Sequence, residues 1–230
     1  MKKNKKILII YSSIIFFALF LLIIKKENII IKFKKEVIND YPIIITKENK
    51  NNEMDVASIN NNIIGSIKIN GTNINYPIVQ GNDNKYYLNH STNNKKDEKG
   101  SIFLDYRNNL KDRKLLIYGH NSKTLKTALF HDLEKYIDYS FYKNHKYINL
   151  YLNDLKNEYA IFSVMIIKGN KHTKINFNDK EFLEHIDWMN NESIYDTGIN
   201  VNMTDQILTL QTCYYKPANS FLLINAKKIK

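Results

Sequence analysis

The chain has 230 residues, a formal net charge of +11 and one cysteine, Cys213, which excludes an internal disulfide. Residues 1–36 hold nine lysines against two glutamates, so most of the positive charge flanks the first apolar segment. With only two arginines in the whole chain, no basic patch suited to nucleic-acid binding is expected on the folded part.

Residues 7–24 form an apolar run, interrupted only by Tyr11, Ser12 and Ser13, with lysines on both sides. At about 1.5 Å rise per residue, a helix over this run nearly spans a hydrocarbon core of about 30 Å. No small-x-small cleavage site follows, which favours an uncleaved signal anchor over a cleaved signal peptide. The lysines before the run predict a cytoplasmic N-terminus. Residues 1–26 are therefore predicted to be a cytoplasmic tail and transmembrane anchor of a single-pass cell-membrane protein with an extracellular C-terminal domain.

Residues 27–62 are dominated by lysine and asparagine and predict a juxtamembrane linker, with a helical segment at 29–37. From residue 63 short alternating apolar runs favour strands, and Asn70-Gly71 is a strong hairpin signal. Strands are predicted at 63–69, 74–79, 101–104, 114–118, 147–152, 159–167, 206–212 and 221–227. Apolar side chains at helical spacing predict helices at 127–136 and 178–189. Residues 63–230 thus predict one mainly β domain with few helices.

Cys213 ends the alternating run 206–213, where a strand is expected to give way to a loop. Three readings are open for this lone thiol: an inert buried side chain, an intermolecular link, or a nucleophile. A metal site is not expected, because a second cysteine and a histidine pair at ligand spacing are missing. No feature calls for a cofactor.

A nucleophilic cysteine needs a partner that stabilises its thiolate, and imidazole is the usual one. Of six histidines, His120 is distinctive because it follows the predicted strand 114–118 and is preceded by Gly119, which permits a tight turn. His131, His145 and His185 are expected at the solvated surface. His90 is ambiguous.

Several segments resemble the sortase family, class B in particular. TLQTC at residues 209–213 resembles the sortase cysteine signature, and YGHN at 118–121 resembles its histidine motif. Residues 64–69, 76–80, 84–90 and 100–108 are similar to class B segments in the same order, and the predicted helix at 178–189 falls where class B members insert one. The resemblance covers roughly residues 60–230.

The resemblance implies an eight-stranded sortase-type β-barrel and a cysteine transpeptidase of the Gram-positive cell surface. Cys213 would attack the peptide bond after the threonine of a C-terminal sorting motif, and the acyl group would pass to an amine of the peptidoglycan precursor. His120 would be the general acid and base. The expected partners are sorting-signal peptides of surface proteins, this peptidoglycan amine and the membrane.

One position departs from the family. Sortases carry an arginine on the strand after the cysteine, where it contacts substrate or the developing oxyanion, and this position falls on Phe221. Candidate substitutes for oxyanion or substrate binding are Thr212, Tyr214, Lys216 and Asn121. Losing one oxyanion donor costs about 2.7–4 kcal/mol of transition-state stabilisation. The alternatives are a substitute donor, a slow enzyme, or a catalytically impaired module that binds sorting-signal peptides.

Overall fold

A computed structural model describes Lys25 and residues 60–122, 128–152 and 155–230 of the chain. The predicted anchor and all but the last three residues of the predicted linker 27–62 lie outside these ranges. Within them, no helix is long and apolar enough to cross a membrane. The residues from 60 onward belong to one compact unit. Asn60, assigned by the sequence to the linker, is buried in this unit and donates to Tyr87 Oη at 2.8 Å.

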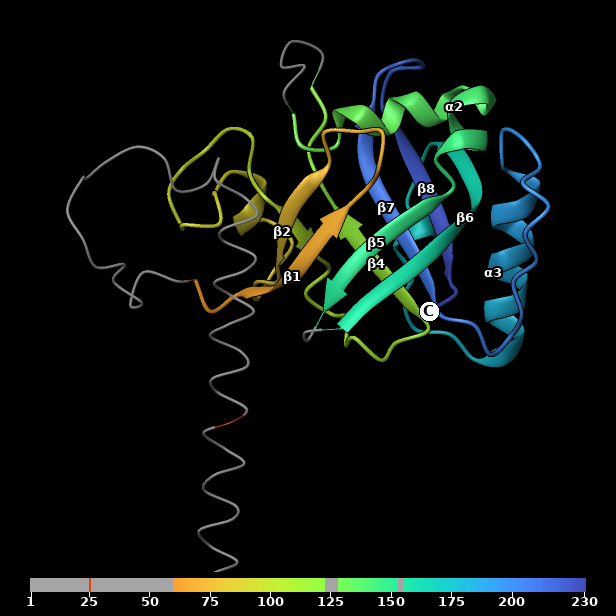
Figure 1. Cartoon of the computed structure of the whole chain (residues 1–230), viewed down its shortest axis with the longest axis horizontal. Coiled ribbons are helices and arrows are strands. Elements are labelled where there is room, and N and C mark those ends of the chain that lie inside the picture. Colours follow the sequence, from red (N-terminus) through yellow and green to blue (C-terminus); the bar gives the residue numbers. More distant parts are fainter. Residues whose placement is uncertain (1–24, 26–59, 123–127, 153–154) are drawn as a thin grey trace, which may run out of the picture. The chain divides into compact units, whose positions relative to one another are not determined.

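Eight strands close into a barrel in the order β1-β2-β3-β4-β7-β8-β6-β5 (Figure 1). The strands are β1 (Ile63–Lys68), β2 (Asn75–Val79), β3 (Ile102–Leu104), β4 (Lys114–Tyr118), β5 (Tyr147–Leu152), β6 (Leu155–Ile167), β7 (Ile207–Tyr214) and β8 (Ser220–Lys228). Neighbouring strands are antiparallel except β2 with β3 and β4 with β7. The predicted mainly β fold and all eight predicted strands are confirmed. The hairpin predicted at Asn70-Gly71 joins β1 to β2, with Gly71 at a φ of +79°.

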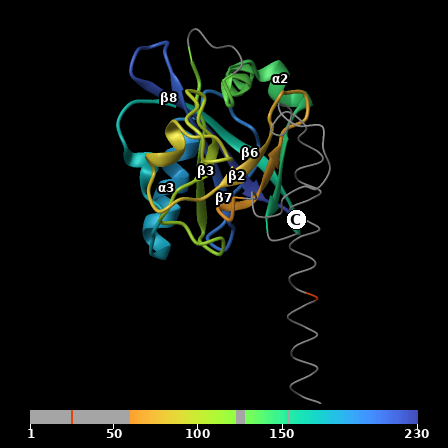
Figure 2. The same ribbon diagram turned by 90° about the vertical axis from the view of Figure 1, so that its left-hand side faces the viewer.

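The helices differ more from the prediction. The predicted helix at 127–136 is a 3₁₀ helix, η4 (His131–Ile137), and a short helix that the sequence did not reveal, α2 (Tyr139–Asn144), follows it. Two further 3₁₀ turns are η3 (Tyr86–Leu88) and η5 (Lys171–Thr173). Figures 1 and 2 together show α2 at one end of the barrel and α3 (Asp179–Asn191) along its side.

Helix α3 confirms the prediction for 178–189, with one correction to its apolar face. Asn178 is the N-cap, and its side chain and that of Glu181 form a capping box. Leu183, assigned to the buried stripe by the sequence, is 41% exposed, whereas His185 is buried. The side chains of α3 that pack against β6 and β8 are Phe182, Ile186 and Met189.

The barrel core fixes which side chains of β4 and β7 face outwards. Leu115 and Ile117 of β4 and Leu208 and Leu210 of β7 belong to the buried core. Because side chains alternate along a strand, the intervening positions lie on the outer face. These outward positions are Lys114, Leu116, Tyr118, Thr209, Gln211 and Cys213. The segment 168–178 between β6 and α3 lies against this outer face, as the contacts of Lys114 show.

Lys114 is fully buried and fastens that segment to β4. Its Nζ donates to the carbonyl oxygens of His172 and Lys174 at 2.5 and 3.1 Å, and it lies 3.0 Å from His185 Nε2. The prediction that His185 lies at the surface is therefore wrong, because its ring packs between Phe177 and Trp188 beside the ammonium.

This cluster predicts how stability depends on pH. Burial lowers the pKa of Lys114 from 10.5 to about 7 and that of His172 from 6.5 to about 4. Between pH 4 and 10 the unfolded chain therefore binds more protons at these two sites, so their contribution to the free energy of unfolding increases with pH. We expect the free energy of unfolding, measured by urea denaturation, to rise from pH 5 to pH 9. Lys114→Met should flatten it above pH 7, and an equally steep rise in that variant would contradict the assignment.

Candidate active site

The two motif residues are brought together by the parallel pairing of β4 with β7. In this register Tyr118 lies opposite Gln211, so His120 and Cys213 lie at the same level, two residues further along each chain. The pairing continues past Tyr118, because Gly119 N donates to Gln211 O at 3.2 Å and Thr212 Oγ1 donates to Gly119 O at 2.8 Å. The backbones that carry His120 and Cys213 therefore lie at the carboxyl ends of two adjacent parallel strands.

Gly119 is needed for packing, whereas the sequence suggested a tight turn. A Cβ atom at Gly119 would lie 2.5 Å from the ring of Phe130. Phe130 is fully buried, and its backbone N–H donates to His120 O at 2.9 Å. The glycine thus lets the segment that leads into η4, which contains Phe130, lie close against the strand end that carries His120.

Cys213 is half-buried on the outer face of β7 and is the next-to-last residue of that strand. Burial raises the pKa of its thiol, so the thiolate needs a cationic neighbour to be populated. His120 is half-exposed, and its Nε2 lies 2.6 Å from Leu88 O at the end of η3. Because a carbonyl oxygen only accepts, this contact makes Nε2 a donor.

Asn121 ties the two strand ends together. Its Nδ2 donates to Cys213 O at 3.1 Å and to Glu134 Oε1 at 2.5 Å, and its Oδ1 accepts from His131 Nδ1 at 2.9 Å. The side chain is only 2% exposed. Both amide hydrogens are used inside the protein, which favours a role in holding the site together over the substrate contact that the sequence allowed. His131, expected at the surface, is half-buried in this cluster.

The other predicted substrate-binding residues lie in different surroundings. Thr212 is buried, and its hydroxyl is committed to Gly119 O. Tyr214 packs against the barrel core, and Lys216 is exposed in the loop between β7 and β8. Phe221 lies directly opposite Cys213 in the β7–β8 ladder. Its side chain packs among the apolar residues between the barrel and α3.

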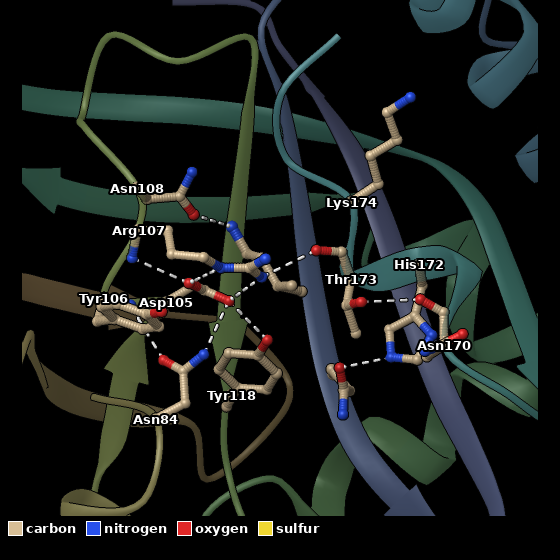
Figure 3. A network of polar contacts seen from close by, with 12 residues as sticks. Asn84, Asp105, Tyr106, Arg107, Asn108, Tyr118, Asn170, His172, Thr173 and Lys174 are labelled. Atoms are coloured by element: carbon tan, nitrogen blue, oxygen red, sulfur yellow. Dashed lines mark hydrogen bonds and ion pairs between the residues drawn. The ribbon is translucent and has the colours of Figure 1, made fainter.

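A polar network that the sequence did not reveal lies beside this site (Figure 3). Arg107 binds the buried Asp105 through Nε at 2.9 Å and Nη2 at 2.7 Å, and Nη2 also donates to Thr173 O at 2.9 Å. Tyr118 Oη donates to Asp105 Oδ2 at 2.8 Å. These bonds hold the pKa of Asp105 below its ordinary value despite its burial. Arg107 therefore joins the loop after β3 to η5.

Among the described residues, no three His, Cys, Asp or Glu side chains are placed to hold a metal ion.

Comparison with known proteins gives consistent matches over the same part of the chain. A family model described as "Sortase domain" matches residues 67–229. Sortase B of Staphylococcus aureus is 34% identical over 186 residues, which cover 76% of this chain and 73% of that protein, and sortase B of Listeria monocytogenes is 34% identical over 79% of this chain and 78% of that protein. The crystal structure of Clostridium perfringens sortase B superimposes with a TM-score of 0.71 at 35% identity, over 75% of this chain and 96% of that one. A substrate complex of S. aureus sortase B gives a TM-score of 0.71 at 31% identity, over 86% of this chain and 95% of that one.

Proposed function

The chain belongs to the sortase family of cysteine transpeptidases, and from this premise we propose that it is a membrane-anchored class B-type enzyme with Cys213 as nucleophile and His120 as general acid and base. The observation that carries the proposal is the parallel register that sets His120 level with Cys213. The substrate that we propose is a sorting-signal peptide of a surface protein. A solved structure of S. aureus sortase B is described as a substrate complex, which supports binding of a substrate by this fold.

The reaction has two halves. The Cys213 thiolate attacks the carbonyl carbon of the threonine in the sorting motif, a C–S bond forms, and the C–N bond breaks as His120 gives a proton to the leaving amine. A peptidoglycan amine then attacks the thioester and loses a proton to His120, so that a new C–N bond forms and the thiolate leaves. Dividing the transfer in this way replaces one difficult step by two easier ones.

Phe221 motivates a second candidate, a module that binds sorting-signal peptides without processing them. The ring opposite Cys213 cannot donate a hydrogen bond to an oxyanion, and one such donor is worth about 10²–10³ in rate. The experiment that separates the two candidates is incubation of the detergent-solubilised full chain with a panel of sorting-motif peptides, with and without an added amine. Cleavage followed by amine transfer supports the enzyme. Saturable binding without any cleavage supports the module.

The location we propose is the outer face of the cell membrane, with residues 7–24 as the anchor. The lysines before this run favour a cytoplasmic N-terminus, and an uncleaved anchor keeps a transpeptidase beside newly exported substrates. We expect protease added to intact cells to digest the C-terminal domain while mass spectrometry of the mature protein still finds residues 1–24. A mature chain that starts after residue 24 would instead identify a cleaved signal peptide.

A further inference from the structure

Gln211 is the nearest polar side chain to Cys213 on the same face of β7. The two residues are separated by one position, so their side chains leave the same face of the strand about 6.6 Å apart. Gln211 lies between Tyr118 of β4 and Leu223 of β8 and is half-exposed. A carboxamide at this place has the length to reach a peptide bound at Cys213.

The orientation of this carboxamide is set by His172. His172 Nε2 lies 2.7 Å from Gln211 Oε1, and the His172 side chain is 1% exposed. Two side chains hold the backbone around His172. Lys114 donates to the carbonyl oxygen of His172, and Arg107 donates to that of Thr173. Figure 3 shows the carbonyl oxygen of Thr173 bonded to Arg107, with His172 next to Thr173 on the same segment.

The position of the His172 proton follows from burial. The pKa of His172 is lowered to about 4 by desolvation, so the ring is neutral near pH 7 and carries one N–H. Nδ1 is buried and has no hydrogen-bond partner within the described ranges. A proton on Nδ1 would leave a buried N–H unpaired, which is costly, so it lies on Nε2 and is donated to Gln211 Oε1. The amide nitrogen of Gln211 is thereby turned away from His172.

The residue opposite Cys213 explains why another hydrogen-bond donor to the peptide is needed at this site. Phe221 lies opposite Cys213, and its ring centre is 5.2 Å from that of His172. The position that aligns with the family's arginine thus holds a phenyl ring, tilted against the uncharged imidazole of His172. Within the described residues, no hydrogen bond of the protein takes the Gln211 amide nitrogen, which remains available to a ligand.

We propose that Gln211, oriented by His172, donates a hydrogen bond to a backbone carbonyl oxygen of the bound sorting peptide beside Cys213, in place of the arginine that Phe221 replaces. The inference rests on the proposed function for the identity of the peptide. Gln211 is then a substrate-binding residue, and His172 is a positioning residue that acts through it.

Two substitutions at Gln211 test this contact in the full chain. Gln211→Glu keeps an oxygen for His172 and replaces the donor by an acceptor, and Gln211→Met removes both polar atoms at similar length. We expect kcat/KM for a sorting-motif peptide to fall about 100-fold in the first and about 10-fold in the second. Alkylation of Cys213 by iodoacetamide reports the reactivity of the thiol without any peptide. In Gln211→Met the ratio of kcat/KM to the alkylation rate constant should therefore be about 10-fold lower than in the wild type.

Binding measured in a Cys213→Ala background gives the same comparison without turnover. Calorimetry should show the peptide Kd rising about tenfold with Gln211→Glu. If the wild type binds peptide without cleaving it and this loss of affinity is still seen, the proposed function fails while the role of Gln211 holds. His172→Phe, which keeps the packing on Phe221 but frees the amide, should weaken binding less than Gln211→Glu.

The rival donor is Lys216, exposed in the β7–β8 loop. Wild-type cleavage and affinity in both Gln211 variants would overturn the proposal. Loss of activity in Lys216→Ala with retention in Gln211→Met would likewise overturn it and assign the contact to the lysine.

Discussion

Replacing Cys213 by alanine should abolish peptide cleavage and thioester formation while leaving the barrel folded. The chain holds one thiol, so no other side chain can form the thioester. Removing a covalent nucleophile costs about 10⁶-fold in kcat in a well-studied protease. Cys213 is only half-buried and its sulfur fills no core position, so we expect the free energy of unfolding to change by about 1 kcal/mol or less.

The measurement is peptide cleavage followed by chromatography, together with thermal unfolding of the same preparation. Cys213→Ser is the matched control, because it replaces the thiol by a hydroxyl of similar size at the same position and should be nearly as inactive. Peptide cleavage retained by the alanine variant would remove Cys213 from the mechanism.

His120→Ala should produce the second-largest loss. General acid–base catalysis by a positioned side chain is worth about 10²–10⁴ in rate, and His120 is the imidazole level with Cys213 in the β4–β7 register. The expected result is a fall of this size in kcat, measured at equal folded concentration.

Two other histidines serve as matched controls. His90 stacks on Tyr86 and should lose little activity on replacement by alanine. His131 contacts Asn121 Oδ1, so His131→Ala should loosen the site and cost about tenfold or less. A larger loss in either variant than in His120→Ala would contradict the assignment of His120.

The strands and the barrel were predictable because alternation of apolar and polar residues is a local signal. The strand Ile207–Tyr214 shows this, because its inward side chains belong to the core and its outward ones include Gln211 and Cys213. The helical region after His120 was less predictable, because the 3₁₀ helix at His131–Ile137 gives an apolar spacing similar to that of an α-helix. His185 was misassigned because its burial depends on Lys114, 71 residues away in the chain.

The motif residues of the site were visible in the sequence, but their surroundings were not. TLQTC and YGHN identify Cys213 and His120, whereas the contact of His172 with Gln211 joins residues 39 apart. The sequence also could not show that Asn121 and Thr212 use their donors inside the protein, since this follows from the parallel pairing of β4 with β7. Long-range pairing decided which candidate side chains are available to a substrate.

Cys213 should form a thioester with the threonine of a sorting motif. Mass spectrometry of the intact wild-type protein, quenched in acid during turnover of a sorting-motif peptide, detects this intermediate. The expected result is a mass increase equal to the peptide up to its threonine, mapped to Cys213 after digestion and lost on adding an amine. Turnover without any adduct on Cys213, or an adduct on another residue, would contradict the claim.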